Sequence, residues 1–183
     1  MRAFIAIDLP TSIQTALAQA QADLRARGPD CRWTRSEGIH LTLKFLGPIS
    51  DAQAEQVTQA LAALAPFGVF SVEVRGFGFF PDARHPRVFW AGLEAPPNLG
   101  ELAQRVEEAM ARLGFAPETR PFAPHLTLAR LKVPRPQPAL AALVEPKSGV
   151  SLGRFEVSEF FLFESKISPR GAEYRKVARF PPV

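Results

Sequence analysis

Two copies of a short pattern, His-x-Thr, have the residue types for acid–base chemistry. The first copy is His40 and Thr42, and the second is His125 and Thr127. In a strand, residues two apart point to the same face, so each histidine shares a face with its threonine. Near neutral pH one imidazole can accept a proton while the other donates one, and a threonine hydroxyl can donate a hydrogen bond to a phosphate oxygen. The pattern therefore predicts a two-histidine site for phosphodiester cleavage.

The two patterns belong to an internal duplication with an offset of 85 residues. Residues 4–46 and 89–131 align without a gap and share 14 identities in 43 positions. Both His-x-Thr patterns and a Thr-Arg pair before each of them match in this register. We therefore expect two related lobes, approximately 1–84 and 85–183, that form one domain around a pseudo-twofold axis and bring both patterns to one cleft.

Hydrophobic periodicity predicts the elements that would position these residues. A helix is expected from Thr11 or Ser12 to just before Gly28, and a capping box at Ser50 and Gln53 opens a second. Apolar positions between residues 99 and 113 recur at helical spacing. In addition to the two motif strands, strands are expected at 4–7, 69–74 (ending at Gly76 and Gly78), 88–93 and 155–163. Such a mixture indicates an α+β fold with mostly antiparallel sheets and outer helices.

Cationic side chains near the two patterns are candidates for binding a phosphate. Lys44 has the same strand parity as His40 and Thr42, so it is expected to reach the cleft. Arg130 has the opposite parity to His125 and would reach a phosphate only if its strand ends or bulges near Ala129. Arg35 and Arg120, five residues before each histidine, could flank the groove.

Other residues offer weaker candidates. Phe4, Trp33 and Trp90 could stack a base, although Phe4 and Trp90 fit the core better than this role. The third histidine, His85, has no counterpart at the 85-residue offset and is expected in a loop. Cys31 is the single cysteine, so an internal disulfide is excluded.

Composition narrows the class of protein. The chain has 183 residues, 46% of them hydrophobic, and a formal net charge of +4, which fits a globular protein with a moderately basic surface. No apolar run is long enough to span a membrane, and the first residues lack the core of a signal peptide. We expect a cytoplasmic protein. Two histidines without a third nearby ligand also fall short of a zinc site.

Four segments resemble the RNA 2′,3′-cyclic phosphodiesterase family, also called 2′-5′ RNA ligases, of the two-histidine (HxTx motif) phosphoesterase superfamily. These segments are 2–10 (RAFIAIDLP), 39–47 (IHLTLKFLG), 121–130 (PFAPHLTLAR) and 160–165 (FFLFES), with Tyr174 beyond the last. The resemblance covers nearly the whole chain in order. No motif position departs from the family pattern.

The resemblance implies hydrolysis of RNA 2′,3′-cyclic phosphate ends to 2′-phosphates. His40 would donate a proton to the leaving 3′ oxygen and His125 would accept one from water, whereas spacing alone does not assign these roles. Thr42 and Thr127 would hold phosphate oxygens with help from Arg130. The family further implies an RNA partner such as tRNA and a reverse 2′-5′ ligation without ATP. We also expect a monomer that needs no cofactor and no metal.

Two alternative functions remain open at this point. The first is a phosphodiesterase of the same superfamily that acts on 2′-5′ oligoadenylate or on small cyclic nucleotides. The second is a non-catalytic RNA-binding module that keeps the fold. Loss of a motif histidine would favour the second alternative, but both histidines are present.

Overall fold

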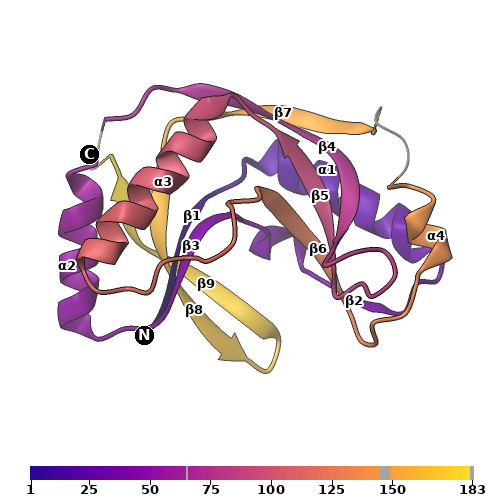
Figure 1. Ribbon diagram of the computed structural model, residues 1–183. Coiled ribbons are helices and arrows are strands. Elements are labelled where there is room, and N and C mark those ends of the chain that lie inside the picture. Colours follow the sequence, from indigo (N-terminus) through magenta and orange to yellow (C-terminus); the bar gives the residue numbers. More distant parts are fainter. Residues whose placement is uncertain (65, 145–148, 182–183) are drawn as a thin grey trace.

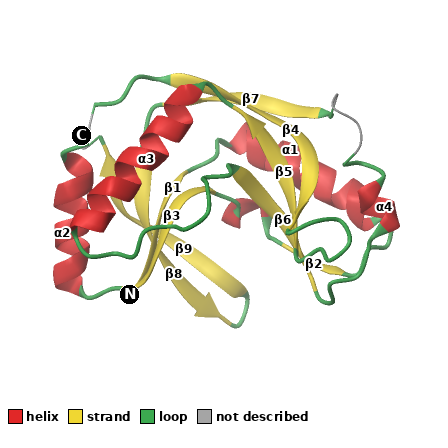
Figure 2. Ribbon diagram, viewed as in Figure 1, coloured by secondary structure: helices red, strands yellow, loops and turns green. Residues whose placement is uncertain are grey.

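The computed structural model describes residues 1–64, 66–144 and 149–181. Two antiparallel sheets form the centre of the molecule, and helices cover them from opposite ends (Figures 1 and 2). One sheet has the strand order β3-β1-β8-β9 and the other has the order β2-β6-β5-β4-β7. The predicted mixture of antiparallel sheets and outer helices is confirmed.

The four-stranded sheet consists of β1 (Arg2–Ile7), β3 (Leu41–Pro48), β8 (Phe160–Ser168) and β9 (Gly171–Phe180). The five-stranded sheet consists of β2 (Cys31–Trp33), β4 (Phe70–Phe80), β5 (Val88–Glu94), β6 (His125–Leu131) and β7 (Ser151–Val157). The helices are α1 (Thr11–Arg25), α2 (Asp51–Ala62), α3 (Pro97–Arg112) and α4 (Pro138–Ala141), with a 3-10 turn η1 (Ser36–Gly38).

The two sheets do not coincide with the segments 1–84 and 85–183 that were expected as lobes. Strand β4 of the first half lies between β5 and β7 of the second, while β8 and β9 extend the sheet of β1 and β3. The helices exchange in the same way, because α1 packs against β7 and α3 packs against β3. Each half of the chain therefore completes the sheet of the other half.

Several predicted boundaries change for local reasons. Helix α1 begins at Thr11, but Pro10 occupies its N-cap without a side-chain hydrogen bond, so neither Thr11 nor Ser12 is the cap. The capping box of Ser50 and Gln53 is confirmed. Strand β4 continues through Gly76, whose φ of 74° accompanies a register shift, and the predicted strand 155–163 is divided between β7 and β8.

Both motif strands carry a β-bulge at equivalent positions. Along β1 and β3, Ile5 pairs with Lys44 and Ala6 pairs with Thr42, so Leu43 is the extra residue. Along β5 and β6, Phe89 pairs with Ala129 and Trp90 pairs with Thr127, so Leu128 is the extra residue. Leu43 and Leu128 are 85 residues apart, and an extra residue reverses the faces of all side chains beyond it.

The bulges decide which cation shares the face of its motif. Lys44 lies opposite Ile5 on the core side and is only 3% exposed, so the prediction that it reaches the cleft is wrong. Its Nζ lies 2.8 Å from Glu107 Oε1 and donates to the Ala116 carbonyl at 3.0 Å. Arg130 moves the opposite way, onto the face of Thr127.

The first strands of the two halves are related by 84 residues rather than 85. Phe89 holds the place of Ile5 in the core, whereas Phe4 lies on the opposite face of its sheet, in a small cluster with Phe161 and Phe163. The identity of Phe4 and Phe89 in the ungapped alignment is therefore not a structural equivalence.

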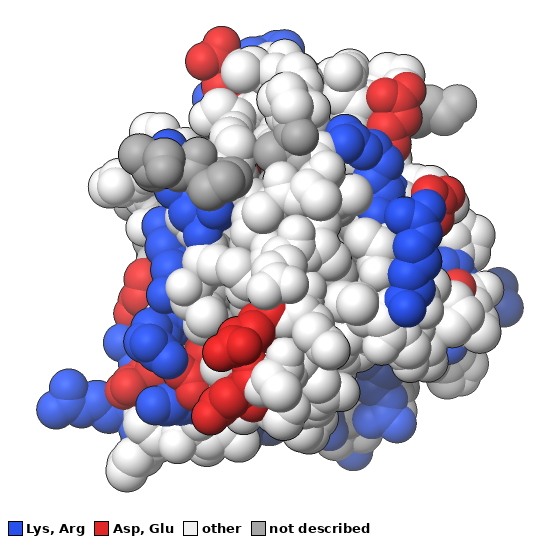
Figure 3. Space-filling view, turned by 90° about the vertical axis from the view of Figure 1, so that its left-hand side faces the viewer, with Lys and Arg blue, Asp and Glu red and all other residues white. Residues whose placement is uncertain are grey.

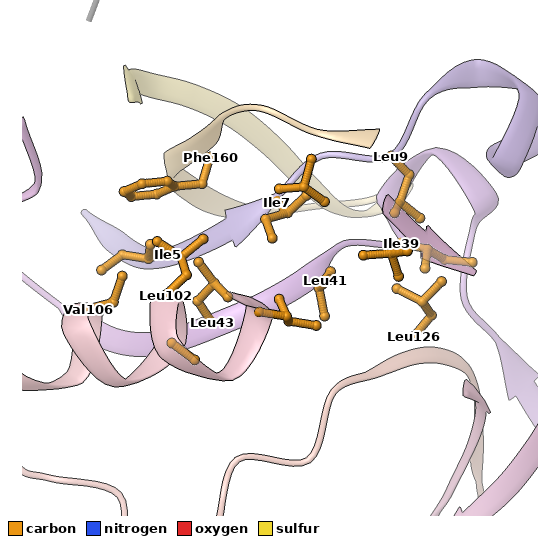
Figure 4. Packing of buried hydrophobic residues seen from close by; sticks show 14 of the residues in the cluster. Ile5, Ile7, Leu9, Ile39, Leu41, Leu43, Leu102, Val106, Leu126 and Phe160 are labelled. Atoms are coloured by element: carbon orange, nitrogen blue, oxygen red, sulfur yellow. The ribbon is translucent and has the colours of Figure 1, made fainter. Parts of the chain in front are cut away.

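A single hydrophobic cluster connects the sheets beneath the motif strands. Leu41 and Leu126, the residues between each histidine and its threonine, are fully buried in this cluster. Figure 4 shows Leu126 beside Leu41 and Ile39. The core thus fixes the side of each strand on which the motif residues lie.

Replacing Lys44 should affect stability and not phosphate binding. We expect Lys44→Ala to lower the free energy of unfolding by about 2–3 kcal/mol, because it leaves the partly buried Glu107 without its cation. Urea denaturation measures this change, with the exposed Lys132→Ala as the control. Weaker binding of inorganic phosphate by Lys44→Ala than by the control would contradict this prediction and indicate that Lys44 contacts phosphate in the cleft.

Gln21 of α1 supports the bulge in β6. Its side chain is 4% exposed, and its Nε2 donates to the Leu128 carbonyl at 3.0 Å and to the Thr34 carbonyl at 2.6 Å. Gln21→Leu should lower the free energy of unfolding by about 1–3 kcal/mol, because the Thr34 carbonyl loses the amide donor and the Leu128 carbonyl keeps only the Thr34 N–H. In urea denaturation the exposed Gln19→Leu should differ little from wild type, and equal stabilities of the two variants would contradict this role.

Candidate active site

The two motif strands lie where the sheets meet. Strand β3 is an edge of its sheet, and Cα atoms of β3 and β6 approach within 8 Å. Because Leu41 and Leu126 face the shared core, the alternation of the strands turns His40, Thr42, His125 and Thr127 away from it. All four are half-buried residues at this surface, although the His40 side chain itself is only 6% exposed.

His40 is enclosed by aromatic rings of the four-stranded sheet. Ring centroids of Phe163, Tyr174 and Phe4 lie 4.5, 5.0 and 5.6 Å from the imidazole. Only 6% of the His40 side chain is exposed. These contacts hold the ring in one orientation and remove most of its water.

Burial lowers the pKa of His40 below its ordinary value because the charged imidazolium loses solvation. Asp8 and a hydrogen bond with the Gly38 backbone act in the opposite direction and raise that pKa, whereas the Lys176 ammonium lowers it further. The Nε2 atom of His40 lies 3.9 Å from Asp8 Oδ1. His40 is therefore poised between a desolvating pocket and a nearby carboxylate.

His125 is oriented from the other sheet. Its Nδ1 lies 2.7 Å from the Ala123 carbonyl, and the Phe80 ring meets it edge-on at 4.8 Å. Because a carbonyl only accepts hydrogen bonds, this contact assigns the proton to Nδ1 and leaves Nε2 as the free nitrogen of the neutral ring. Gly38 and Ala123 each precede their histidine by two residues, so both repeats use the same backbone position.

The predicted cations have different surroundings. Arg130 is exposed on the face of Thr127, as the bulge requires. Arg35 lies beside the pocket that contains His40, but its Nε donates to Glu37 Oε1 at 2.8 Å and its Nη1 donates to the Arg170 carbonyl at 3.2 Å. Arg120 is exposed in the loop before β6 and has no ion pair within the described ranges.

The aromatic candidates are also separated by the fold. Phe4 is buried but lines the site face beside His40, and Trp90 is half-buried on the same face as its cross-strand neighbour Thr127. Trp33 of β2 packs against the Arg25 guanidinium, 5.8 Å from the ring centroid. His85 is exposed in a loop, as expected.

A pocket of about 560 Å³ opens beside His40, bounded by the β8–β9 hairpin and η1. It is lined by Asp8, Tyr174 and Lys176 among others. Sequence reasoning did not assign a role to Asp8 or Lys176. Lys176 is too distant in the sequence for spacing to reveal the contact, and Asp8 follows a strand whose pairing with β3 was not known.

Charge on the rest of the surface is mixed. On the face shown in Figure 3, lysine and arginine side chains are separated by uncharged surface and by acidic side chains. This distribution agrees with the moderate net charge of +4. In the described part of the chain no helix is long and apolar enough to cross a membrane.

Comparison with known proteins gives consistent matches over the whole chain. The family model described as LigT like Phosphoesterase matches residues 7–90 and 93–174. An RNA 2′,3′-cyclic phosphodiesterase of Methanothermobacter thermautotrophicus is 32% identical over 181 residues, which cover 98% of each chain.

Solved structures agree with these matches. The crystal structure of TT0787 from Thermus thermophilus has a TM-score of 0.82 and 31% identity, and the match covers 98% of this chain and 97% of that chain. Escherichia coli LigT complexed with 3′-AMP has a TM-score of 0.79 and 28% identity, with 98% and 96% covered. With one His-x-Thr strand inside each matched segment, the chain belongs to the LigT-like phosphoesterase family.

Proposed function

We propose that this protein hydrolyses RNA 2′,3′-cyclic phosphate ends to 2′-phosphates. The observation that carries the proposal is the pair of His-x-Thr strands whose intervening leucines, Leu41 and Leu126, are buried in one core cluster, with the His125 Nδ1 held 2.7 Å from the Ala123 carbonyl. Relatives at about 30% identity with the name RNA 2′,3′-cyclic phosphodiesterase support this choice of substrate.

The reaction assigns a task to each motif histidine. His125 would take a proton from a water molecule through Nε2 as the water oxygen attacks phosphorus. The bond between phosphorus and the 3′ oxygen then breaks, and His40 would donate its proton to that oxygen. The products are a 2′-phosphate and a 3′-hydroxyl. Proton transfers of this kind contribute roughly 10²–10⁴-fold to the rate.

The other predicted site residues would stabilise charge on phosphorus. The Thr42 and Thr127 hydroxyls would donate to the non-bridging oxygens, and Arg130 would pair with the phosphate from the mouth of the site. Fixed donors aimed at developing charge stabilise a transition state more than a ground state. Lys44 is excluded from this set because its ammonium is held by Glu107.

The proposal has further parts. Since two imidazoles supply both proton transfers, the reaction would need no metal ion or nucleotide cofactor. With a 5′-hydroxyl in place of water as the nucleophile, attack on the cyclic phosphate would break the same bond between phosphorus and the 3′ oxygen and form a 2′-5′ bond without ATP. We also propose that the protein works as a cytoplasmic monomer on RNA ends.

Removing either motif histidine should strongly reduce turnover. We expect His40→Ala and His125→Ala to reduce the rate by about 10²–10⁴-fold on a short RNA with a 2′,3′-cyclic phosphate end. Chromatography of the product identifies the 2′-phosphate. His85→Ala is the matched control, because the His85 side chain is 75% exposed and lies outside the motif strands.

The same assay separates the alternative functions. If the folded wild-type protein leaves this RNA intact but cleaves 2′-5′ oligoadenylate, the proposed substrate is wrong and the proposed site stands. Full activity of either motif variant would refute the two-histidine mechanism.

Chelation should leave the reaction unchanged. We expect the initial rate with excess EDTA to equal the untreated rate within error, because the proposed proton transfers and phosphate contacts use protein side chains alone. The rate after EDTA and the rate after added zinc or magnesium are measured on the same sample. Loss of turnover that a metal restores would contradict metal independence.

A further inference from the structure

The two motif histidines occupy equivalent positions but have different cross-strand neighbours. Ile7 pairs with Leu41, so continuing the antiparallel register places Asp8 opposite His40. In the other sheet Gly92 pairs with His125. With the 84-residue relation between β1 and β5, Asp8 and Gly92 hold the same place. One histidine thus faces a carboxylate where the other faces a residue without a side chain.

The difference is imposed by packing around Gly92. A Cβ atom built on Gly92 would lie 2.6 Å from the Arg75 carbonyl oxygen of β4, which is closer than real contacts allow. No acidic side chain can therefore take this position without displacing the neighbouring strand. Within the described ranges, His125 has no carboxylate oxygen within 4.0 Å of its ring nitrogens, whereas His40 has Asp8 Oδ1 at 3.9 Å.

Asp8 is itself held in place. Its Oδ2 lies 2.6 Å from Lys176 Nζ, and its Oδ1 accepts a hydrogen bond from the Leu9 backbone N–H at 3.1 Å. The Lys176 ammonium is in turn positioned over the Phe161 ring, 4.2 Å from its centroid. The carboxylate therefore points at the His40 pocket from a fixed direction.

The separation of 3.9 Å suits an electrostatic role. It is too long for a hydrogen bond, so the Nε2 proton of a charged His40 stays free for a substrate oxygen. It is short enough for an opposite charge to favour the charged form of a histidine. Burial favours the neutral ring, which cannot act as an acid, and it is the larger effect on the His40 pKa, so the carboxylate offsets it in part.

We propose that Asp8 is a positioning residue that offsets part of the desolvation of His40 and so helps His40 to carry the proton that it donates as the general acid. This inference rests on the proposed function for its catalytic meaning.

Other charged groups around the pocket have partners of their own. From the segment around η1, Arg35 pairs with Glu37. From β9, Arg175 pairs with Glu164, and Glu173 accepts from Ser168 Oγ at 2.9 Å. Tyr174 meets His40 through its ring edge. Asp8 and Lys176 are the two charged side chains that act on the His40 pKa, in opposite directions.

The test is the pH dependence of kcat/KM for Asp8→Asn and Lys176→Met. Asp8 raises the His40 pKa, so its removal lowers that pKa and the protonated acid is lost at a lower pH. We expect the alkaline limb of Asp8→Asn to move down by about one pH unit. At the alkaline end its activity falls about tenfold, with little change at the acidic end. Lys176→Met should move the same limb upward.

A second readout does not depend on turnover. NMR titration of the imidazole signals should show a lower His40 pKa in Asp8→Asn than in the wild type. Asp8→Glu keeps the charge and should retain the wild-type alkaline limb, which separates electrostatics from a loss of folding. Asp23→Asn, on the exposed surface of α1, and Lys132→Gln are the matched controls.

Each contrary outcome has one meaning. Movement of the acidic limb instead of the alkaline one in Asp8→Asn would make His40 the base and overturn the proposal. An unchanged His40 titration would overturn it as well. If the wild type does not cleave cyclic phosphates, the proposed function fails, and the NMR titration still decides whether Asp8 controls His40.

Discussion

The burial of two leucines beneath the junction of the sheets is the constraint on which the site depends. Leu41 and Leu126 are fully buried in the one cluster that both sheets share. Each is flanked by the histidine and threonine of its motif, so turning either strand over would bury a His-x-Thr pair and expose a leucine. The side on which the motif residues lie is therefore set by the hydrophobic core and not by contacts among the polar groups.

The bulges add a second level of control that simple alternation does not contain. An extra residue at Leu43 sends Lys44 into the core, and an extra residue at Leu128 brings Arg130 to the site face. Regular alternation without a bulge would put Lys44 on the face of its motif and Arg130 on the opposite face. The bulge in each repeat reverses this, so the lysine is buried and the arginine reaches the site face. The carbonyl of Leu128 is satisfied by the Gln21 side chain and the Thr34 N–H, which makes the irregularity a stable part of the structure.

What the sequence predicted follows from local rules. The strand register of both motifs, the capping box at Ser50 and the mixture of helices with antiparallel strands all depend on neighbouring residues. The errors concern relations that periodicity does not encode. Alternation identifies a strand but not its partner, so the exchange of β4 and β8 between sheets was missed. A bulge adds a residue without a distinct pattern, hence the error at Lys44, and the contact of Asp8 with His40 requires the register of β1 against β3.

The exchange of strands also limits how the two halves of the chain can differ. A polypeptide of one half alone would lack the third strand of its sheet, whereas two identical copies could complete each other by swapping that strand. Such a symmetric pair would carry the same residue at the places of Asp8 and Gly92, and hence two histidines with the same proton affinity. Joining the halves in one chain removes that identity. Covalent linkage therefore permits a nearly symmetric fold to give its two motif histidines different neighbours, a carboxylate for one and a glycine for the other.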